Sequence, residues 1–569
     1  MSFFSQVALL ILVVMLMAPV FAAGQRFGSP WRDAAPPTTA DADAAIPAPD
    51  YDARFESSHF TGSANCSGCH NNLRDAQGDV ISLGTEWSGS MMAHAARDPV
   101  FHAKFASEQK RNPALTDVLS EKCLRCHAPM AVIEAGFDGQ SLTLLEDTGI
   151  LDPANPYHDQ AMEGVSCMVC HQIEDAPELG EKESFSGGFS IPTMLETSER
   201  VAYGQYALPS ERLMRDRSGV LPVHSDHMED SALCATCHEL NTPVVDGDGE
   251  VVSGHELPEQ AVYSEWQQSD FADDGAMPQS CQDCHMERAD GVRMANRPRR
   301  LTPVDDLKRH RFSGANTVVM DILNNHRAEL GVTSGDMDNA IQANREFLLR
   351  AADIRITSAK RLGGLLEVRV EVSNRTGHKL PTGYPSRRVW IDFEVRGEDG
   401  SELFRSGRMN ADGSIVGLDA DHGGPDFEPH YRVISSEQQV QVYESVMGDT
   451  DGGLTYTLLG GAAYLKDNRI PPAGFDKTRA SANVAVVGDA LADGNFGDGT
   501  DRVTYRVPLP SPGSLQIHVA LRYQPLSAGF LNDLFRDADL PLVARFQGYW
   551  EDAELRAETL ASVDLSLTR

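Results

Sequence analysis

Every cysteine of this chain belongs to one repeated five-residue frame, C-x-x-C-H. The frame occurs as CSGCH (66–70), CLRCH (123–127), CMVCH (167–171), CATCH (234–238) and CQDCH (281–285). Two thiols at this spacing can add to the two vinyl groups of one porphyrin, and the histidine that follows then lies under the ring and binds the iron. The sequence therefore predicts five covalently attached c-type haems.

Each frame is expected to supply two thioether cysteines and one proximal histidine. The predicted haem-attaching residues are Cys66, Cys69, Cys123, Cys126, Cys167, Cys170, Cys234, Cys237, Cys281 and Cys284. The predicted proximal iron ligands are His70, His127, His171, His238 and His285. Other uses of cysteine fit worse, because disulfides do not require a histidine after each pair and zinc ribbons pair two frames, whereas five is an odd number.

The frames lie close together in the sequence. From Cys66 to His285 the chain has 220 residues, which is 44 residues for each haem. With so little polypeptide per porphyrin, the haems must form much of the core and lie close enough to exchange electrons. We expect a pentahaem cytochrome c domain over residues 51–350, made mainly of short helices and irregular connections.

The second axial ligand decides what each haem can do, since a bis-ligated haem carries electrons whereas an open iron can bind a substrate. Three histidines outside the frames are predicted distal ligands. His227 lies seven residues before the fourth frame, and His310 lies between the last frame and a predicted helix over 316–330. His378 lies in RTGHKLPTG (375–383), a turn that can hold one side chain rigidly toward the other half; the alternative is a turn residue that caps its own loop.

The first haem region offers a methionine and a further histidine. The stretch EWSGSMMA (86–93) resembles EWQQSDFA (265–272), because both read E-W-x-x-S-x-x-A and each accompanies a frame. This pattern indicates a diverged internal repeat. Met92 or the neighbouring His94 is a candidate distal ligand, and a methionine ligand would raise the potential of its haem. The alternative is that the methionines pack against porphyrin.

The second half has the pattern of a β structure. Polar and apolar residues alternate at 365–372 and 388–395, and further strands are expected at 438–446, 501–509 and 514–523. Short alternating strands separated by glycine-rich turns favour a β-sandwich, of the Ig-like type, over residues 351–525. A helical C-terminal tail is expected over 526–569. The predicted fold class is therefore multidomain α+β.

The N-terminal residues 1–23 are typical of an export signal, and 24–50 of a disordered linker. The apolar run within 1–23 has signal-peptide length and ends at a proline, but no basic residue precedes it. An uncleaved membrane anchor is therefore the alternative. Because covalent haem attachment takes place outside the cytoplasm, we expect a location in the periplasm or at the cell surface.

Charge limits the class of partner. The chain has 49 basic and 83 acidic side chains, a net charge of −34. This balance argues against nucleic acid and against anionic membrane surfaces, which attract lysine and arginine patches. Redox partner proteins with basic patches are expected, although a solvated acidic surface without a partner explains the charge equally well. The oligomeric state is left open.

The chain resembles the multihaem c-type cytochromes of bacterial respiration. Motifs such as GVSCMVCH (164–171) and SCQDCHM (280–286) are similar to those of the branch that includes the tetrahaem carriers of hydroxylamine oxidation and, more distantly, the pentahaem nitrite reductases. The segment NRTGHKLPTGYPSRR (374–388) resembles the β-rich C-terminal part of large multihaem cytochromes. In that branch a W-x-x-S-x-H stretch supplies a distal histidine, whereas Met92 and Phe271 stand at the matching positions here.

Two functions fit these residues. The first is an exported electron carrier that passes electrons along its haems, without catalytic residues. The second is a haem-dependent oxidoreductase, in which one open haem acts on a small nitrogen or sulfur compound with a proton donor such as Arg97, Arg125 or His158 nearby. The nitrite reductases bind their catalytic haem through a C-x-x-C-K frame, which this chain lacks. Whether the protein is an enzyme is left open, with the carrier preferred.

Overall fold

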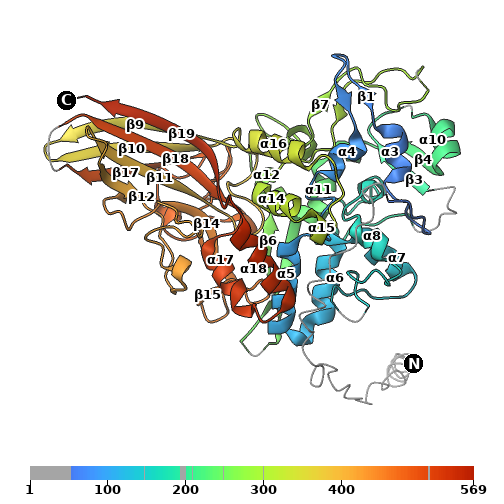
Figure 1. The fold of residues 1–569 in the computed structure, drawn as a ribbon, viewed down its shortest axis with the longest axis horizontal. Helices are drawn as coiled ribbons and strands as arrows, with labels where there is room; N and C mark the ends of the chain where they lie inside the picture. Colours follow the sequence, from blue (N-terminus) through green and yellow to red (C-terminus); the bar gives the residue numbers. More distant parts are fainter. Residues whose placement is uncertain are drawn as a thin grey trace, which may run out of the picture. The chain divides into compact units, whose positions relative to one another are not determined.

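The computed structural model describes residues 53–145, 148–192, 200–207, 209–247, 249–298, 300–509 and 513–568. The predicted signal peptide (1–23) and linker (24–50) lie outside these residues. The described residues belong to one unit of the chain, residues 43–569, so the helical and the β-rich parts are described together (Figure 1). None of the described helices is long and apolar enough to cross a bilayer.

Short helices carry the five frames. They are α3 (Ala64–His70), α6 (Thr116–His127), α9 (Cys167–Cys170), α11 (Ser231–His238) and α13 (Cys281–His285). Local capping helps to start two of them: Asp230 accepts a hydrogen bond from the backbone N–H of Ala232, and Ser280 forms a capping box with Asp283. These caps satisfy N–H groups that a helix of one or two turns cannot pair internally.

The other helices of the first half pack around these frame helices. They are α4 (Leu83–Ser88), α5 (Pro99–Arg111), α7 (Pro129–Phe137), α8 (His158–Met162), α10 (Glu211–Ser218), α12 (Val262–Gln267), α14 (Thr317–Asn325), α15 (Arg327–Leu330) and α16 (Met337–Leu348). The helix predicted over 316–330 is thus two helices rather than one. They meet at His326, whose ring lies on Tyr549 with 4.1 Å between the ring centroids.

Strands are few in the first half and form only two-stranded sheets. These are β1 (Leu73–Arg74) with β2 (Val80–Ile81), β3 (Arg200–Gly204) with β4 (Val220–His224), β5 (Glu239–Val245) with β6 (Val251–Ala261), and β7 (Arg288–Ala289) with β8 (Leu307–Lys308). The β5–β6 hairpin is the longest of them, and its second strand reaches the haem region described below.

The second half contains two sheets. One has the order β13–β17–β10–β9, and the other has the order β15–β14–β11–β18–β19, with β12 beside β11 and β16 beside β14. The bounds are β9 (Ala352–Leu362), β10 (Leu365–Asn374), β11 (Arg388–Gly397), β12 (Glu402–Ser406), β13 (Val433–Ile434), β14 (Val442–Gly448), β15 (Leu454–Thr455), β16 (Ala463–Asp467), β17 (Thr500–Pro508), β18 (Leu515–Gln524) and β19 (Glu558–Leu567). The prediction of a β-rich second half after a helical first half is confirmed.

The two sheets share one apolar core. Phe393 of β11 stacks on Tyr505 of β17, with ring centroids 3.9 Å apart. Alternate residues of β10, such as Val368 and Val370, are fully buried in the same cluster. Period-2 alternation places one face of each strand against the opposite sheet, so this core follows directly from the sequence pattern.

The predicted helical tail over 526–569 is helical only in its first part. Helices α17 (Ala528–Leu534) and α18 (Pro541–Asp552) are followed by β19, which pairs with β18 from Glu558 to Leu567. The physical reason is tertiary pairing. Strand β18 offers a complete edge to the last residues, and the alternating Ala561, Val563, Leu565 and Leu567 pack on the sandwich core.

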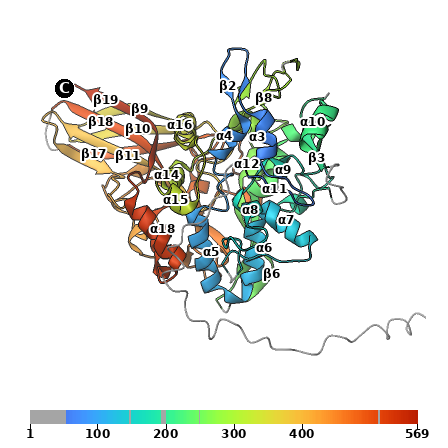
Figure 2. The same cartoon turned by 45° about the vertical axis from the view of Figure 1, so that its right-hand side comes forward.

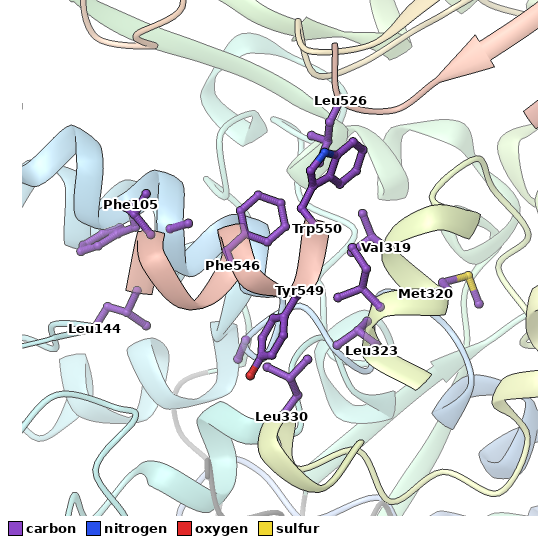
Figure 3. Packing of buried hydrophobic residues seen from close by; sticks show 14 of the residues in the cluster. Phe105, Leu144, Val319, Met320, Leu323, Leu330, Leu526, Phe546, Tyr549 and Trp550 are labelled. Carbon is purple, nitrogen blue, oxygen red and sulfur yellow. The ribbon is translucent and has the colours of Figure 1, made fainter. Parts of the chain in front are cut away.

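A second apolar core joins the C-terminal helices to the first half. Phe546 and Trp550 of α18 lie in one buried cluster with Phe105 of α5 and Leu323 of α14 (Figure 3). Helix α18 lies beside α5 in Figure 1 and again in the rotated view of Figure 2. The segment that follows the β strands therefore supports the helices around the haem frames.

Candidate haem cavity

All five frames line one continuous cavity of about 2440 Å³. Both cysteines and the histidine of every frame are among its lining residues. Divided among five frames, this volume is about 490 Å³ each, which lies within the range of about 300–1000 Å³ of a pocket for a single cofactor. The space and the donor set thus fit one covalently attached haem at each frame.

No disulfide joins the ten cysteines, and sulfurs of different frames lie beside one another at three places. Cys167 donates a hydrogen bond to Cys66, which raises the pKa of Cys167. The same contact from Cys126 to Cys237 raises the pKa of Cys126. A third contact of this kind joins the fourth and fifth frames. There Cys234 donates to Cys281, which raises the pKa of Cys234. Neighbouring frames therefore bring their attachment edges into contact.

Backbone carbonyls orient the proximal histidines. Nδ1 of His127 donates to the carbonyl of Ala95 at 2.9 Å, and Nδ1 of His171 donates to that of Tyr203 at 2.6 Å. In each ring this hydrogen bond fixes the tautomer in which Nε2 carries a free lone pair, the form that binds a metal. Burial also lowers the pKa of His238, to about 4, which favours the neutral ring that ligation requires.

Two proximal histidines face a second imidazole. The rings of His171 and His310 have centroids 6.2 Å apart and planes 9° from parallel. Those of His285 and His378 have centroids 6.3 Å apart and an angle of 18°. An iron bound at about 2 Å by Nε2 of two opposed imidazoles separates the ring centroids by roughly 6 Å. Both pairs have the spacing and orientation of bis-histidine ligation.

The two facing histidines are held by their own loops. Nδ1 of His310 donates to the carbonyl of Lys308 at 3.0 Å, and Nδ1 of His378 donates to that of Lys379 at 2.9 Å. Burial lowers the pKa of His310 to about 3 and that of His378 to about 4. His378 therefore does bond within its own loop, but through Nδ1, which leaves Nε2 for the cavity.

The other candidate distal ligands are placed differently. His227 lies outside the cavity lining and uses both ring nitrogens, with Nδ1 2.7 Å from the Ser225 hydroxyl and Nε2 2.9 Å from the Ile173 carbonyl. His94 is buried and also lies outside the lining, whereas Met92 lines the cavity. None of these three forms an opposed pair with a frame histidine, and their ligation stays a prediction.

The second frame has a different environment. Phe101 stacks on His127, with ring centroids 3.8 Å apart. Among the residues that the structure describes, no second imidazole faces His127 as His310 faces His171. The cavity beside this frame is instead lined by polar side chains. They are Lys104, Glu108, Glu259 and Tyr384.

This polar group is buried and tightly connected. Lys104 and Glu108 form an ion pair of 2.9 Å on one face of α5, and Glu259 of β6 accepts a hydrogen bond of 2.6 Å from Thr242. Burial raises the pKa of Glu259 to about 7 against the opposing hydrogen bond from Thr242, and the nearby Glu108 adds a smaller increase. Burial and the same two carboxylates raise the pKa of Tyr384. The group can hold and release a proton near neutral pH.

Sequence reasoning missed these four residues. They come from α5, β6 and the loop after His378, and no local motif connects them. The two arginines and the histidine that were expected as proton donors are engaged elsewhere: Arg97 donates to the carbonyl of Met162, Arg125 donates to that of Gly187 at 2.7 Å, and His158 lies outside the cavity lining. In the sequence, Glu259 is one of several acidic residues of the β5–β6 hairpin, and nothing in its local pattern marks it as a cavity residue.

Known proteins resemble this chain in its first three frames and in its fold. Residues 65–172, which contain the first three frames, match the family described as "Cytochrome c554 and c-prime". A penta-heme cytochrome c552 from Thermochromatium tepidum has a similar structure, with a TM-score of 0.51 and 14% identity over 90% of this chain and 100% of that one. No curated protein matches this chain. Residues 65–172 thus match the cytochrome c554 and c-prime family, and the chain as a whole has a fold similar to that of a penta-heme cytochrome, with a β-rich C-terminal part.

Proposed function

We propose that the protein binds five haems c and transfers electrons along them between partner proteins outside the cytoplasm. The observation that carries the proposal is the pair of opposed imidazoles at two frames, His171 with His310 and His285 with His378, within a cavity that all five frames line. Two nitrogen ligands keep an iron low-spin, so that it changes oxidation state without binding a substrate. The haem, when bound, supplies the one-electron redox chemistry.

The contacts between frames suggest an order for the transfer. Cys66 meets Cys167, which joins the first and third frames. Cys126 and Cys170 both lie near Cys237, which joins the second and third frames to the fourth. Cys234 meets Cys281, which joins the fourth and fifth frames. We infer a path that runs from the first frame through the third to the fourth, where it divides toward the second and fifth.

The axial pairs give the test of this proposal. In purified ferric holoprotein, His310→Ala and His378→Ala should each convert one haem equivalent from low spin to high spin, measured by EPR and by visible absorption. His518→Ala is the matched control, because His518 is an exposed strand residue that pairs with Asp564 at 2.8 Å, far from the frames in the sequence. Unchanged spectra in both ligand variants would contradict the assignment.

The strand order supports an Ig-like sandwich for the second half. An Ig-like domain places strands A, B, E and D in one sheet and C, F and G in the other. Assigning A, B, C, D, E, F and G to β9, β10, β11, β13, β17, β18 and β19 reproduces both orders. One departure is that β13 runs parallel to β17 over its two residues. Export, a periplasmic or surface location, and redox partners with basic patches belong to the same proposal.

A second candidate function rests on the polar group beside the second frame. If no side chain binds the distal position there, a small nitrogen or sulfur compound can reach it, and Glu259 and Tyr384 can deliver protons. Adding cyanide, nitrite or hydroxylamine to the ferric protein distinguishes the two functions. A high-spin signal that shifts with added ligand supports the oxidoreductase, and low-spin spectra that ignore all three support the carrier alone.

A further inference from the structure

The repeated stretch E-W-x-x-S-x-x-A has the same local structure in both copies. Its first copy lies at the end of α4 and its second at the end of α12. The glutamate and the tryptophan of each copy, Glu86 with Trp87 and Glu265 with Trp266, are buried. A buried carboxylate and a buried indole both need hydrogen-bond partners, and the identity of these partners is informative.

The tryptophans bind the chain just before a frame. Nε1 of Trp87 donates to the carbonyl of Val165 at 2.8 Å, and Nε1 of Trp266 donates to that of Gln279 at 2.9 Å. Each acceptor lies two residues before the first cysteine of a frame, Cys167 in one case and Cys281 in the other. The same contact is thus made at the same register to the third and the fifth frames.

The glutamates bind the loops that carry the facing histidines. Glu86 accepts a hydrogen bond of 3.2 Å from the backbone N–H of His310 itself. Glu265 accepts one of 3.1 Å from the backbone N–H of Lys379, the residue after His378, and another from the Thr382 hydroxyl. In both copies one carboxylate therefore fixes the backbone next to a distal imidazole.

We propose that each E-W-x-x-S copy is a clamp for one haem, whose tryptophan fixes the proximal frame and whose glutamate fixes the loop of the distal histidine. The first copy holds the pair His171 and His310, and the second holds the pair His285 and His378. The inference rests on the axial pairs proposed above. The glutamates and tryptophans are positioning residues, since they act on the iron only through the histidines.

Charge explains why a carboxylate suits this role. A hydrogen bond from a backbone N–H to an ionised carboxylate is roughly twice as strong as one between neutral groups. Each carboxylate is also compensated by an arginine, Glu86 by Arg309 with 2.9 Å from Nε to Oε1, and Glu265 by Arg469 at 2.8 Å. Each arginine thus places a balancing charge beside a carboxylate that would otherwise be buried without compensation.

The second copy also connects the two halves of the chain. Glu265 belongs to α12 of the haem half, whereas Lys379, Thr382 and Arg469 all belong to the β-rich half. Because the distal histidine is donated across this boundary, its position depends on how well the boundary is fixed. The clamp supplies that fixation within two residues of the ligand.

Spin state of the holoprotein tests the clamp. Glu265→Ala should convert part of one haem equivalent to high spin, because the loop of His378 loses two of its anchors, and added imidazole should restore the low-spin form. The decisive measurement is a pair of double variants. Added to His378→Ala, the Glu265→Ala change should produce no further high-spin haem, whereas Glu86→Ala should produce part of a second equivalent.

Further variants keep the test informative if an alanine variant does not mature. Glu265→Gln keeps the size of the side chain and one acceptor, and it should shift the redox potential of one haem while the other four keep theirs. Trp266→Phe removes only the donor to Gln279 and should act on the same haem. Glu134→Gln is the matched control, because buried Glu134 accepts a backbone N–H from Ser58 at 2.9 Å, away from the axial loops.

The outcomes separate the clamp from the axial assignment. If His378→Ala leaves the spectra unchanged, the proposed pair is wrong. If His378→Ala yields high-spin haem but the glutamate and tryptophan variants leave spin state and potentials as in the parent protein, the pair stands and the clamp is wrong. An equal effect of Glu265→Ala alone and on top of His378→Ala would also overturn the clamp, since it would then act on a different haem.

Discussion

At the residue scale, Glu259 beside the second frame should make the reduction potential of the neighbouring haem depend on pH. Burial raises the pKa of Glu259 to about 7, so this carboxyl group is largely neutral below that pH and negative above it. A negative charge near the iron favours the ferric form. The reduction potential of the neighbouring haem should therefore fall as the pH rises through 7.

Replacing the carboxyl group provides the check on this prediction. In a spectroelectrochemical titration, Glu259→Gln should flatten the pH dependence of one haem and raise its potential at pH 8. Glu250→Gln is a suitable control, since Glu250 is an exposed residue of the turn in the same hairpin. The same slope in the Glu259 variant and the parent protein would show that another group titrates there.

Histidines outside the frames show what a sequence can and cannot predict at the residue scale. The frames predict all five proximal ligands, because two cysteines and a histidine at this fixed spacing are typical of haem attachment. His430 shows the limit. The carboxamide NH₂ groups of Gln441 and Asn468 point to its Nδ1, and its Nε2 lies 3.5 Å from Asp493 and 3.7 Å from Asp501. It is a buried polar residue of the β region, and it lacks the rigid turn RTGHKLPTG that favoured His378 as a ligand.

At the scale of elements, strand patterns predicted what local alternation determines. The strands expected at 365–372, 388–395, 501–509 and 514–523 correspond to β10, β11, β17 and β18 within two residues at each end. The two longest strands that were missed, β9 and β19, lie at the outer edges of the two sheets, and the short strands β12, β13, β15 and β16 were missed as well. Both strands do alternate, as Ala561, Val563, Leu565 and Leu567 of β19 show, but pairing with β10 and β18 decides their conformation.

Helix α18 offers a prediction about how the elements support each other. Phe546 is fully buried between α5 and the neighbouring helices (Figure 3). Phe546→Ala should lower the free energy of unfolding by about 3–5 kcal/mol, because the substitution leaves a cavity in a packed core. Since α5 also carries Phe101 and Lys104, the haem at the second frame should shift its absorption as well. Thermal unfolding and visible spectra of the holoprotein measure both effects.

The control for this prediction lies on the same helix. Gln547 is only partly buried and donates to Glu551 at 2.9 Å, so Gln547→Ala should change stability by less than about 0.5 kcal/mol. If the two variants unfold at the same temperature, α18 does not stabilise the haem half in the way that its packing implies.

At the scale of the whole molecule, the two halves are joined by the cavity itself. His378, Thr382 and Tyr384 follow a strand of the β-rich half, yet they line the same cavity as the five frames. The change of sequence character near residue 351 separates two kinds of secondary structure, but it does not separate the cofactor sites. The sequence predicted this contact for His378, because of its rigid turn, whereas no pattern in the sequence indicated Thr382 or Tyr384.

The net charge of −34 predicts how the molecule meets a partner. A field of one sign steers a basic partner toward the surface and raises the association rate, and salt shortens its range from about 10 Å at 0.1 M to about 3 Å at 1 M. Reduction by a small basic electron-transfer protein should therefore slow by at least tenfold as the ionic strength rises from 0.01 to 0.5 M, measured by stopped-flow spectroscopy. Reduction by an uncharged small molecule should not slow. A rate that is independent of salt with the basic protein would mean that the acidic surface serves solvation and not recognition.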